Sequence, residues 1–224
     1  MGTSLVYKSP FFYELFMMVL YGRHYFARLR SVADRIPPGA SVVDLCCGPG
    51  MLYQHYLRHQ GVRYTGLDIN PRFIARLNRR GVRAMVWNLH SDEPLPPADY
   101  VTMLGGLLHF LPDPGPMVDR MLAAAGKQVI ICDPVRNLST SRIGPIAWIA
   151  RRSANPGLGH ASRRFTEETL DAFFRRYASR VSQSFLIPGG RDKVYVLDKE
   201  PRNPGLADPH QTMTAPAAGR FGPA

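Results

Sequence analysis

The sequence predicts an α/β fold of the Rossmann-like kind, a three-layer sandwich in which helices cover both faces of a mostly parallel, seven-stranded sheet. Short apolar runs alternate along the chain with segments of helical periodicity, which is the order expected for parallel strands joined by helices. The central runs are almost entirely apolar, as strands buried on both faces are. Only a turn at Pro188, Gly189 and Gly190 separates the last two runs, so we expect the last strand to be antiparallel.

Each element follows from this alternation. The strands are expected at residues 41–45, 64–68, 83–87, 100–104, 128–132, 181–187 and 193–197, and the helices at about 51–59, 71–80, 116–125 and from 167 onward. The second of these helices has the clearest boundaries, with Asn70 as N-cap, Pro71 in the first turn and Gly81 as the stop. Before the first strand, Leu29 and Val32 recur at helical spacing, which predicts a helix packed on the sheet.

The chain is short enough for one catalytic domain, since a single core serves chains of up to roughly 250 residues. We expect residues 1–36 to form an N-terminal helical cap or lid and residues 37–200 to form the ligand-binding domain. Within that domain the pattern loosens at about 135–165, which we interpret as an insertion that covers the substrate. Residues 201–224 are polar and carry five prolines, so we expect a disordered tail.

Composition and charge narrow the function classes. Hydrophobic residues make up 45% of the chain and charged residues 20%, which argues against a disordered or fibrous protein. The formal net charge of +11 would suit nucleic acid, an anionic membrane or an acidic substrate. The arginines are nevertheless spread over a predicted helix and a later loop, which favours ordinary solvated faces over a dedicated polyanion site.

Cysteine usage and apolar stretches indicate the compartment. Cys46, Cys47 and Cys132 show no CxxC or Cys/His spacing, so we expect a reduced interior and no metal site. Residues 1–10 lack the pattern of a secretory signal, and the apolar stretch 11–21 is shorter than the roughly 20 residues that a spanning helix needs. We expect a cytoplasmic protein, with peripheral contact to the inner face of a membrane left open.

A glycine turn follows the first strand. Gly48 and Gly50 stand where a ligand and the backbone approach closely, because glycine has no Cβ. A dinucleotide site would place glycines where Cys46 and Tyr53 stand, and a carboxylate such as Asp44 would sit badly beside a diphosphate. The turn therefore favours a ligand that carries an amine.

A second carboxylate, Asp68, ends the second strand. At this place in a βαβ unit a carboxylate accepts hydrogen bonds from both hydroxyls of a ribose. Asp68 on its own reads equally well as a helix cap, and the glycine turn on its own as a simple turn. Together they predict a nucleoside ligand.

Over residues 36–199 the chain resembles the class I, seven-strand S-adenosylmethionine (SAM)-dependent methyltransferases. Residues 42–50 look like the first motif of that family, in a form similar to that of the ubiquinone and menaquinone biosynthesis methyltransferases, and Gly66, Leu67 and Asp68 look like its ribose motif. The resemblance implies SAM as cofactor and methyl transfer as activity. It makes residues 37–200 a SAM-binding methyltransferase domain.

The resemblance also implies a set of cofactor contacts. Asp44 would hold the amino group of the methionine part, and Asp68 would take the ribose hydroxyls. Asn88 would accept from the exocyclic amine of adenine. Leu67, Ile69 and Leu89 would enclose the ring. The full set of expected cofactor residues is Asp44, Cys46, Gly48, Gly50, Asp68, Ile69, Asn88, Leu89 and Leu104.

Catalysis of methyl transfer depends mainly on aligning the acceptor with the methyl group, and a base is useful when the acceptor is a hydroxyl or an acidic carbon. His109 and Asp133 are the candidates, although His109 also reads as a packed histidine and Asp133 as ordinary Asp-Pro turn chemistry. Tyr13, Tyr21 and Tyr25 belong to an aromatic segment that we interpret as a lid over the substrate; its apolar part either covers the pocket or touches lipid.

We therefore expect a methyltransferase that acts on a small-molecule or lipid-like acceptor. Residues 103–110, after the fourth strand, do not form the Asn/Asp-Pro-Pro-aromatic motif of enzymes that methylate exocyclic amines of nucleic-acid bases. Nucleic acid is therefore a less favoured partner. The alternatives are an RNA methyltransferase, a non-catalytic SAM-binding module and a dinucleotide enzyme; the oligomeric state is left open.

Overall fold

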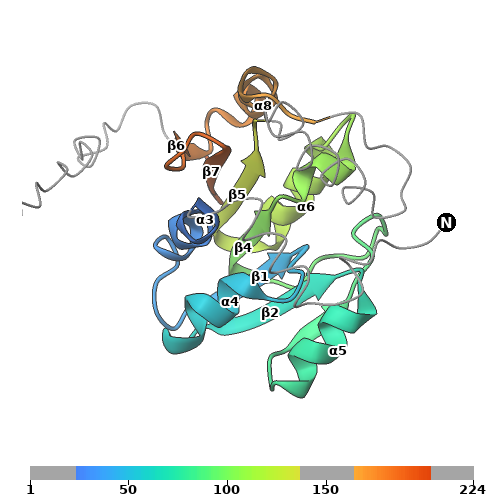
Figure 1. Cartoon of the computed structure of the whole chain (residues 1–224). Coiled ribbons are helices and arrows are strands. Elements are labelled where there is room, and N and C mark those ends of the chain that lie inside the picture. The colour runs from blue at the N-terminus through green and yellow to red at the C-terminus, as the bar shows by residue number, and fades with distance from the viewer. Residues whose placement is uncertain (1–23, 137–163, 203–224) are drawn as a thin grey trace, which may run out of the picture.

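The computed structural model describes residues 24–136 and 164–202. Their strands form a single seven-stranded sheet in the order β3-β2-β1-β4-β5-β7-β6 (Figure 1). The strands are β1 (Ser41–Leu45), β2 (Arg63–Asp68), β3 (Ala84–Val86), β4 (Ala98–Leu104), β5 (Ala125–Pro134), β6 (Val181–Leu186) and β7 (Asp192–Asp198). Strand β7 runs antiparallel to both β5 and β6, and the other neighbouring pairs are parallel. The predicted fold class is confirmed.

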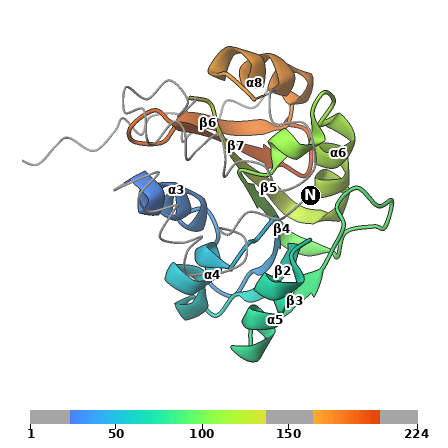
Figure 2. The same cartoon turned by 45° about the vertical axis from the view of Figure 1, so that its right-hand side comes forward.

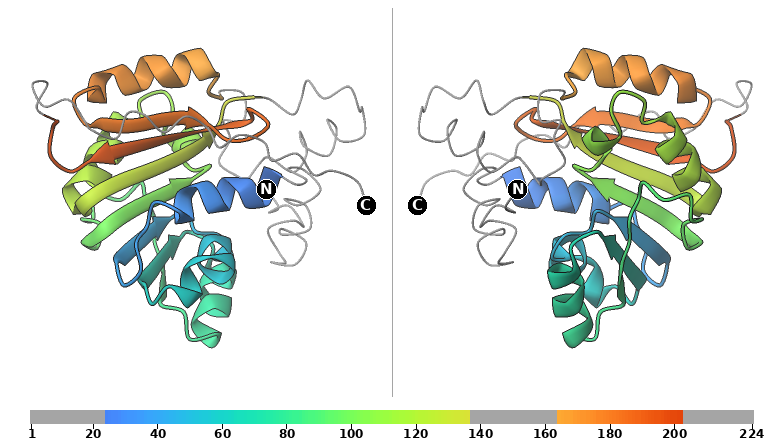
Figure 3. Two further views of the ribbon diagram at one scale, coloured as in Figure 1. Left: turned by 90° about the vertical axis from the view of Figure 1, so that its left-hand side faces the viewer. Right: turned by 90° about the vertical axis from the view of Figure 1, so that its right-hand side faces the viewer.

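Helices cover both faces of the sheet (Figure 2). They are α3 (His24–Ala33), α4 (Met51–His55), η1 (Leu57–His59), α5 (Pro71–Arg79), η2 (Leu107–Phe110), α6 (Gly115–Ala124), α8 (Glu167–Phe174) and η4 (Arg175–Tyr177). Side chains of α3, α4 and α5 pack in one core with one face of the sheet, and side chains of α6 and α8 pack in a second core with the other. Figure 3 shows the sheet with α8 beside β7 at one end and α5 at the other.

The local signals in the sequence account for several boundaries. Strand β1 begins and ends where expected, and the Asn70 side chain accepts a hydrogen bond of 3.0 Å from the amide of Arg72 as the N-cap of α5. The helix expected at 51–59 is divided at Tyr56, which leaves helical geometry at φ −127°. Strand β5 is longer than expected, because its pairing with β7 continues as far as Pro134 and Asp192.

Helix α3 lies against the sheet over β5 and β7 and beside α4. Its buried side chains include Leu29 and Val32, as the helical spacing predicted. The division of the chain into cap, domain, insertion and tail stays a prediction, because residues 1–23, 137–163 and 203–224 lie outside the described residues. No helix in the described ranges is both long and apolar enough to cross a membrane.

The carboxyl ends of four parallel strands meet at one edge of the sheet. Leu45 of β1 is in register with Leu67 of β2 and Met103 of β4, and Leu104 of β4 is in register with Cys132 of β5. Because ligands of open α/β sheets bind outside this edge, we expect the ligand site at the residues that follow these positions.

Candidate cofactor site

The turn after β1 is built from left-handed backbone. Cys46, Gly48 and Gly50 have φ values of 53°, 55° and 77°. For cysteine this conformation is uncommon and costs on the order of 1 kcal/mol or more, which natural proteins accept mainly at functional positions. A Cβ on Gly106 would stand only 2.9 Å from the sulfur atom of Cys46, which is too close for an ordinary contact. The turn after β1 can therefore pack this closely against the turn after β4 only because residue 106 is glycine.

Gly50 has a packing role in this turn. A Cβ at this position would stand 2.6 Å from the side chain of Leu77 on α5, so the missing side chain lets α5 pack against the turn. Gly50 does not line the pocket described below. Its positive φ also makes it the residue that ends the turn before α4 begins.

Asp68 joins the tip of β2 to this turn. Its Oδ2 accepts a hydrogen bond of 2.8 Å from the amide of Gly48, and its Oδ1 accepts one of 2.8 Å from the amide of Asn70. Burial raises the pKa of Asp68, and these two amide donors work against that rise. The side chain is only half-buried. An ionised carboxylate has about four acceptor positions, so two stay available on its open side.

Asp44 lies deeper, at 2% exposure. Its Oδ2 accepts a hydrogen bond of 2.8 Å from the Tyr64 hydroxyl, and its Oδ1 accepts one of 2.8 Å from the Thr102 hydroxyl. Burial raises the pKa of Asp44 to about 6, and the bonds from Thr102 and Tyr64 limit the rise. Sequence reasoning missed both donors. Thr102 meets Asp44 because it is the register partner of Asp44 on β4.

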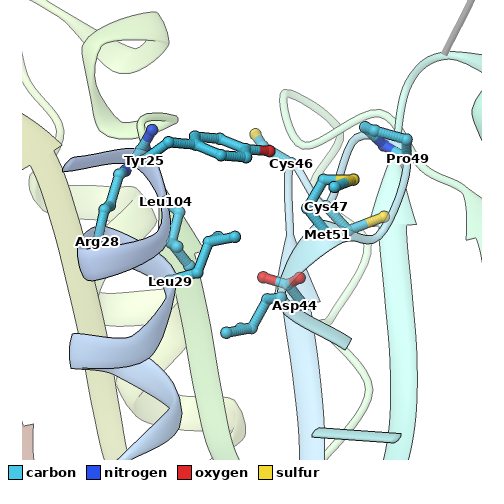
Figure 4. A pocket seen from close by; sticks show the side chains of 10 residues that line it. Tyr25, Arg28, Leu29, Asp44, Cys46, Cys47, Pro49, Met51 and Leu104 are labelled. Atoms are coloured by element: carbon cyan, nitrogen blue, oxygen red, sulfur yellow. The ribbon is translucent and has the colours of Figure 1, made fainter. Parts of the chain in front are cut away.

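A small pocket lies between α3 and the turn after β1. Figure 4 shows the Asp44 carboxylate on the β1 wall and the side chains of Tyr25 and Arg28 on the α3 wall, with the Tyr25 ring reaching toward Cys46. The lining residues are Tyr25, Arg28, Leu29, Asp44, Cys46, Cys47, Pro49, Met51, Leu52 and Leu104. Arg28 and Asp44 are the charged residues among them.

Sequence reasoning also missed Arg28. Its side chain is buried at 4% exposure, and its Nε lies 3.6 Å from Oδ1 of Asp192, which is fully buried at the start of β7. The only signal in the sequence was its place on the apolar face of α3, between Tyr25 and Leu29. An arginine on such a face is uncommon, because burying a charge is costly unless it is paired.

Asp133 belongs to the same buried group. It is fully buried at the end of β5, and its Oδ2 accepts a long hydrogen bond of 3.3 Å from the amide of Leu107. Burial raises the pKa of Asp133 to about 7, while the positive charge of Arg28 acts in the opposite direction. Asp133 does not line the pocket; it lies behind it, beside Arg28 and Asp192.

Comparison with known proteins decides the family. A family model described as a methyltransferase domain matches residues 20–178. This chain belongs to that family. Among curated proteins it is similar to trans-aconitate 2-methyltransferase of Mycobacterium tuberculosis, with 31% identity over 114 residues, or 50% of this chain. The match covers 43% of that relative, so the chain spans less than half of its length.

Solved structures show the same fold. A TehB-like SAM-dependent methyltransferase from Corynebacterium glutamicum has a TM-score of 0.54 at 19% identity, over 82% of this chain and 92% of that one. The magnesium protoporphyrin IX methyltransferase of Synechocystis PCC 6803 with bound SAH has a TM-score of 0.54 at 14% identity, over 83% of this chain and 93% of that one. The family match makes this a methyltransferase domain, and these solved structures share its fold.

Within this methyltransferase domain the other expected cofactor residues occupy different settings. Ile69 is 56% exposed beside Asp68, whereas Leu89, at 7%, and Leu67, at 0%, are buried in the core. Asn88 is exposed, and its side-chain oxygen accepts a hydrogen bond of 3.0 Å from the amide of His90. Cys46 and Leu104 line the pocket, as does the expected lid residue Tyr25. Tyr13 and Tyr21 lie outside the described residues.

His109, the other catalytic candidate, lies within η2, is exposed, and does not line the pocket of the methyltransferase. Desolvation by neighbouring groups, together with the nearby His90, lowers the pKa of His109. At neutral pH its imidazole is therefore uncharged and able to accept a proton.

Proposed function

We propose that the protein transfers the methyl group of SAM to a small-molecule or lipid-like acceptor that meets the cofactor beside α3. The observation that carries this proposal is the hydrogen bond between Asp68 and the amide of Gly48, which holds a ribose-binding carboxylate against the glycine turn. The pocket that contains Asp44 begins at the same turn. When bound, SAM would supply a methyl group that is activated by the positively charged sulfur to which it is bonded.

The residues fit the cofactor at three places. Asp68 keeps two acceptor positions on its open side, which suits the two ribose hydroxyls. Asp44 faces the pocket with a buried carboxylate, and an ammonium group beside it would favour its ionised form. Ile69 presents an exposed apolar side chain next to Asp68, which suits one face of adenine. In this proposal Asn88 and Leu89 lie toward the adenine, and Cys46, Gly48, Gly50 and Leu104 lie toward the methionine part.

Two features support a small acceptor. Two of the similar proteins are a trans-aconitate 2-methyltransferase and a magnesium protoporphyrin IX methyltransferase, which are named for small-molecule substrates. The pocket lining includes Leu29 of α3 and Leu52 of α4, which suit an acceptor with an apolar part.

The acceptor atom determines whether a base is needed. A carboxylate is already ionised at neutral pH and needs only alignment with the methyl group. A hydroxyl needs a base, and a group with a pKa near 7 is the most effective one. Asp133 has such a pKa and His109 is uncharged, so each is a candidate for an acceptor that reaches it.

Calorimetry with S-adenosylhomocysteine (SAH) tests cofactor binding. The protein should bind SAH saturably, and Asp68→Asn should weaken binding at least ~10-fold, because hydrogen bonds to a charged group contribute about 1.5–3 kcal/mol. Asp34→Asn is the matched control, since Asp34 is exposed and pairs with Arg30 on the surface. A folded protein that shows no saturable binding of SAH would refute the proposed activity.

The acceptor class is tested by incubating the protein with methyl-labelled SAM and two fractions of a cell extract, one of small metabolites and lipids and one of purified RNA. The label should enter the first fraction, and mass spectrometry should show a product heavier by one methylene unit. Label that enters only the RNA fraction would replace the small-molecule proposal with an RNA methyltransferase.

A further inference from the structure

We propose that the outer face of α5 binds an anionic lipid bilayer. Its arginine ridge, which consists of Arg72, Arg76 and Arg79, contacts the headgroup phosphates, and the side chain of Val86 enters the apolar boundary beside them. This surface goes beyond the proposed methyl transfer, because a bilayer can be bound without SAM or an acceptor.

The arginine ridge follows one side of α5. Arg72, Arg76 and Arg79 occupy positions i, i+4 and i+7, which lie on the same side of a helix. The buried side chains of the helix are Phe73, Ile74 and Leu77. These pack toward the sheet, so the ridge points away from it. Figure 1 shows α5 at the outer edge of the molecule, where a flat partner can reach it.

The charge of the ridge is not neutralised within the described part of the chain. None of the ion pairs among the described residues includes an arginine of α5. Arg30, Arg176 and Arg202, by contrast, each pair with an aspartate. Residues 69–91 contain five arginines and no acidic residue. A positive field that the protein does not cancel attracts an anionic partner.

The ridge also goes against the local chemistry of a helix. Arg72 lies in the first turn of α5, where the positive end of the helix dipole favours acidic residues, and this turn has none. The favoured arrangement is found in α8, which carries Glu167 and Glu168 in its first turn. Like charges four residues apart, such as Arg72 and Arg76, destabilise a helix further. A helix that only covered the sheet would be more stable with neutral side chains here, so the ridge suits a partner that supplies negative charge.

An exposed apolar side chain lies at one end of the ridge. Val86 is 55% exposed at the carboxyl end of β3, the edge strand that α5 contacts. Side chains alternate along a strand, and Ala84 packs in the same core as Leu77 of α5, so Val86 faces the α5 side of the sheet. Val86 is also the register partner of Asp68, shortly before α5 begins. It therefore lies near the end of α5 that carries Arg72.

This combination of charge and apolar surface favours a bilayer over RNA. Basic side chains beside apolar ones are typical of surfaces that lie in the membrane interface, where arginine stems cover apolar area and their guanidinium groups stay in the polar layer. Single-stranded RNA is bound instead by aromatic side chains on which bases stack. Phe73, the aromatic residue of α5, is buried and unable to stack on a base.

Cosedimentation with vesicles tests the proposal. The unmodified protein should bind equimolar vesicles of phosphatidylglycerol and phosphatidylcholine, and should bind pure phosphatidylcholine vesicles far less. In the ridge variant, which combines Arg72→Gln, Arg76→Gln and Arg79→Gln, affinity for the anionic vesicles should fall roughly 100-fold, because each basic residue at an anionic surface contributes about 5-fold. Lysine at the same three positions should retain most of the affinity, because the charge is kept.

A matched control removes the same charge elsewhere. It combines Arg30→Gln, Arg176→Gln and Arg202→Gln, three positions at which the arginine already pairs with an aspartate. The control variant should lose far less affinity for the anionic vesicles than the ridge variant does. If the two variants lose affinity equally, binding follows net charge alone, and the proposal is wrong.

Three further measurements separate docking from folding, from RNA binding and from methyl transfer. The ridge variant should be at least as stable to urea as the unmodified protein, because it lacks the repulsion between like charges. Val86→Ser should weaken vesicle binding about 3- to 10-fold and leave RNA binding unchanged. Ridge substitutions that weaken RNA binding but not vesicle binding would overturn the proposal. A protein that binds the vesicles through the ridge but does not bind SAH would refute the proposed activity and support the docking surface.

Discussion

The amide of Gly48 donates a hydrogen bond of 2.8 Å to Oδ2 of Asp68, which ties the turn after β1 to the tip of β2. The turn after β1 and the end of the neighbouring strand β2 are thereby held in one geometry. Preorganisation of this kind lowers the entropy cost of binding, because the groups that contact the ligand are already ordered.

Gly106→Ala should disturb the turn that carries Cys46. The added Cβ would stand 2.9 Å from the Cys46 thiol and equally close to the Met103 side chain, so we expect a loss of about 1–3 kcal/mol in the free energy of unfolding, together with weaker SAH binding. Urea denaturation and calorimetry measure the two effects. Gly126→Ala is the control, because its Cβ would meet only ordinary contacts from 3.5 Å outward. A Gly106→Ala variant as stable as the Gly126→Ala control would contradict the packing described here.

Thr102→Val and Tyr64→Phe should each weaken cofactor binding through Asp44. Each variant removes one hydrogen bond that holds the pKa of Asp44 down to about 6, so that pKa should rise and less of the carboxylate should be ionised near neutral pH. We expect a loss of SAH affinity of roughly 5-fold, because one hydrogen bond contributes about 1 kcal/mol. The loss should shrink as the pH is raised. Calorimetry over a range of pH values measures it.

Tyr195→Phe is the matched control for Tyr64→Phe. The Tyr195 hydroxyl donates a hydrogen bond to Asp171 of α8 and not to Asp44. Its removal should leave SAH affinity unchanged. If Tyr195→Phe and Tyr64→Phe reduce the affinity equally, the effect does not run through Asp44.

Asp133 should make the stability of the protein depend on pH. Because burial raises the pKa of Asp133 from 3.8 to about 7, the folded state keeps a proton that the unfolded state has already lost in this range. The stabilising effect is complete below the unfolded pKa and is lost as the pH rises toward the folded one. The free energy of unfolding should therefore fall between these two pH values, apart from contributions of other groups.

The variant Asp133→Asn tests this dependence, because an amide of the same shape cannot ionise. It should retain the hydrogen bond from Leu107 and show a smaller decline of stability with rising pH than the unmodified protein. Urea denaturation at several pH values between 4 and 8 measures both slopes. Arg28 and Asp192 face Asp133 and are unchanged in this variant, so equal slopes in the two proteins would show that Asp133 does not carry the effect.

The sequence alone determined the features that depend on local chemistry. The alternation of apolar runs and helical segments predicted the sheet, and the limits of β1 and the N-cap Asn70 were found where local signals place them. The glycine turn and Asp68 were recognised from residue type and spacing. Such features are readable because each is decided by neighbours along the chain: by side-chain period, by capping and by backbone freedom at glycine.

Only the tertiary structure decided which distant residues meet. Arg28 and Asp192 come from the first and last described elements, and they form a pair because β7 lies beside β5, next to α3. The role of Gly50 also depends on a distant partner, Leu77. Local propensity does not encode such contacts, because they follow from strand order and from how helices pack across the sheet. The ion pair between Arg28 and Asp192 could therefore be found only from the folded chain.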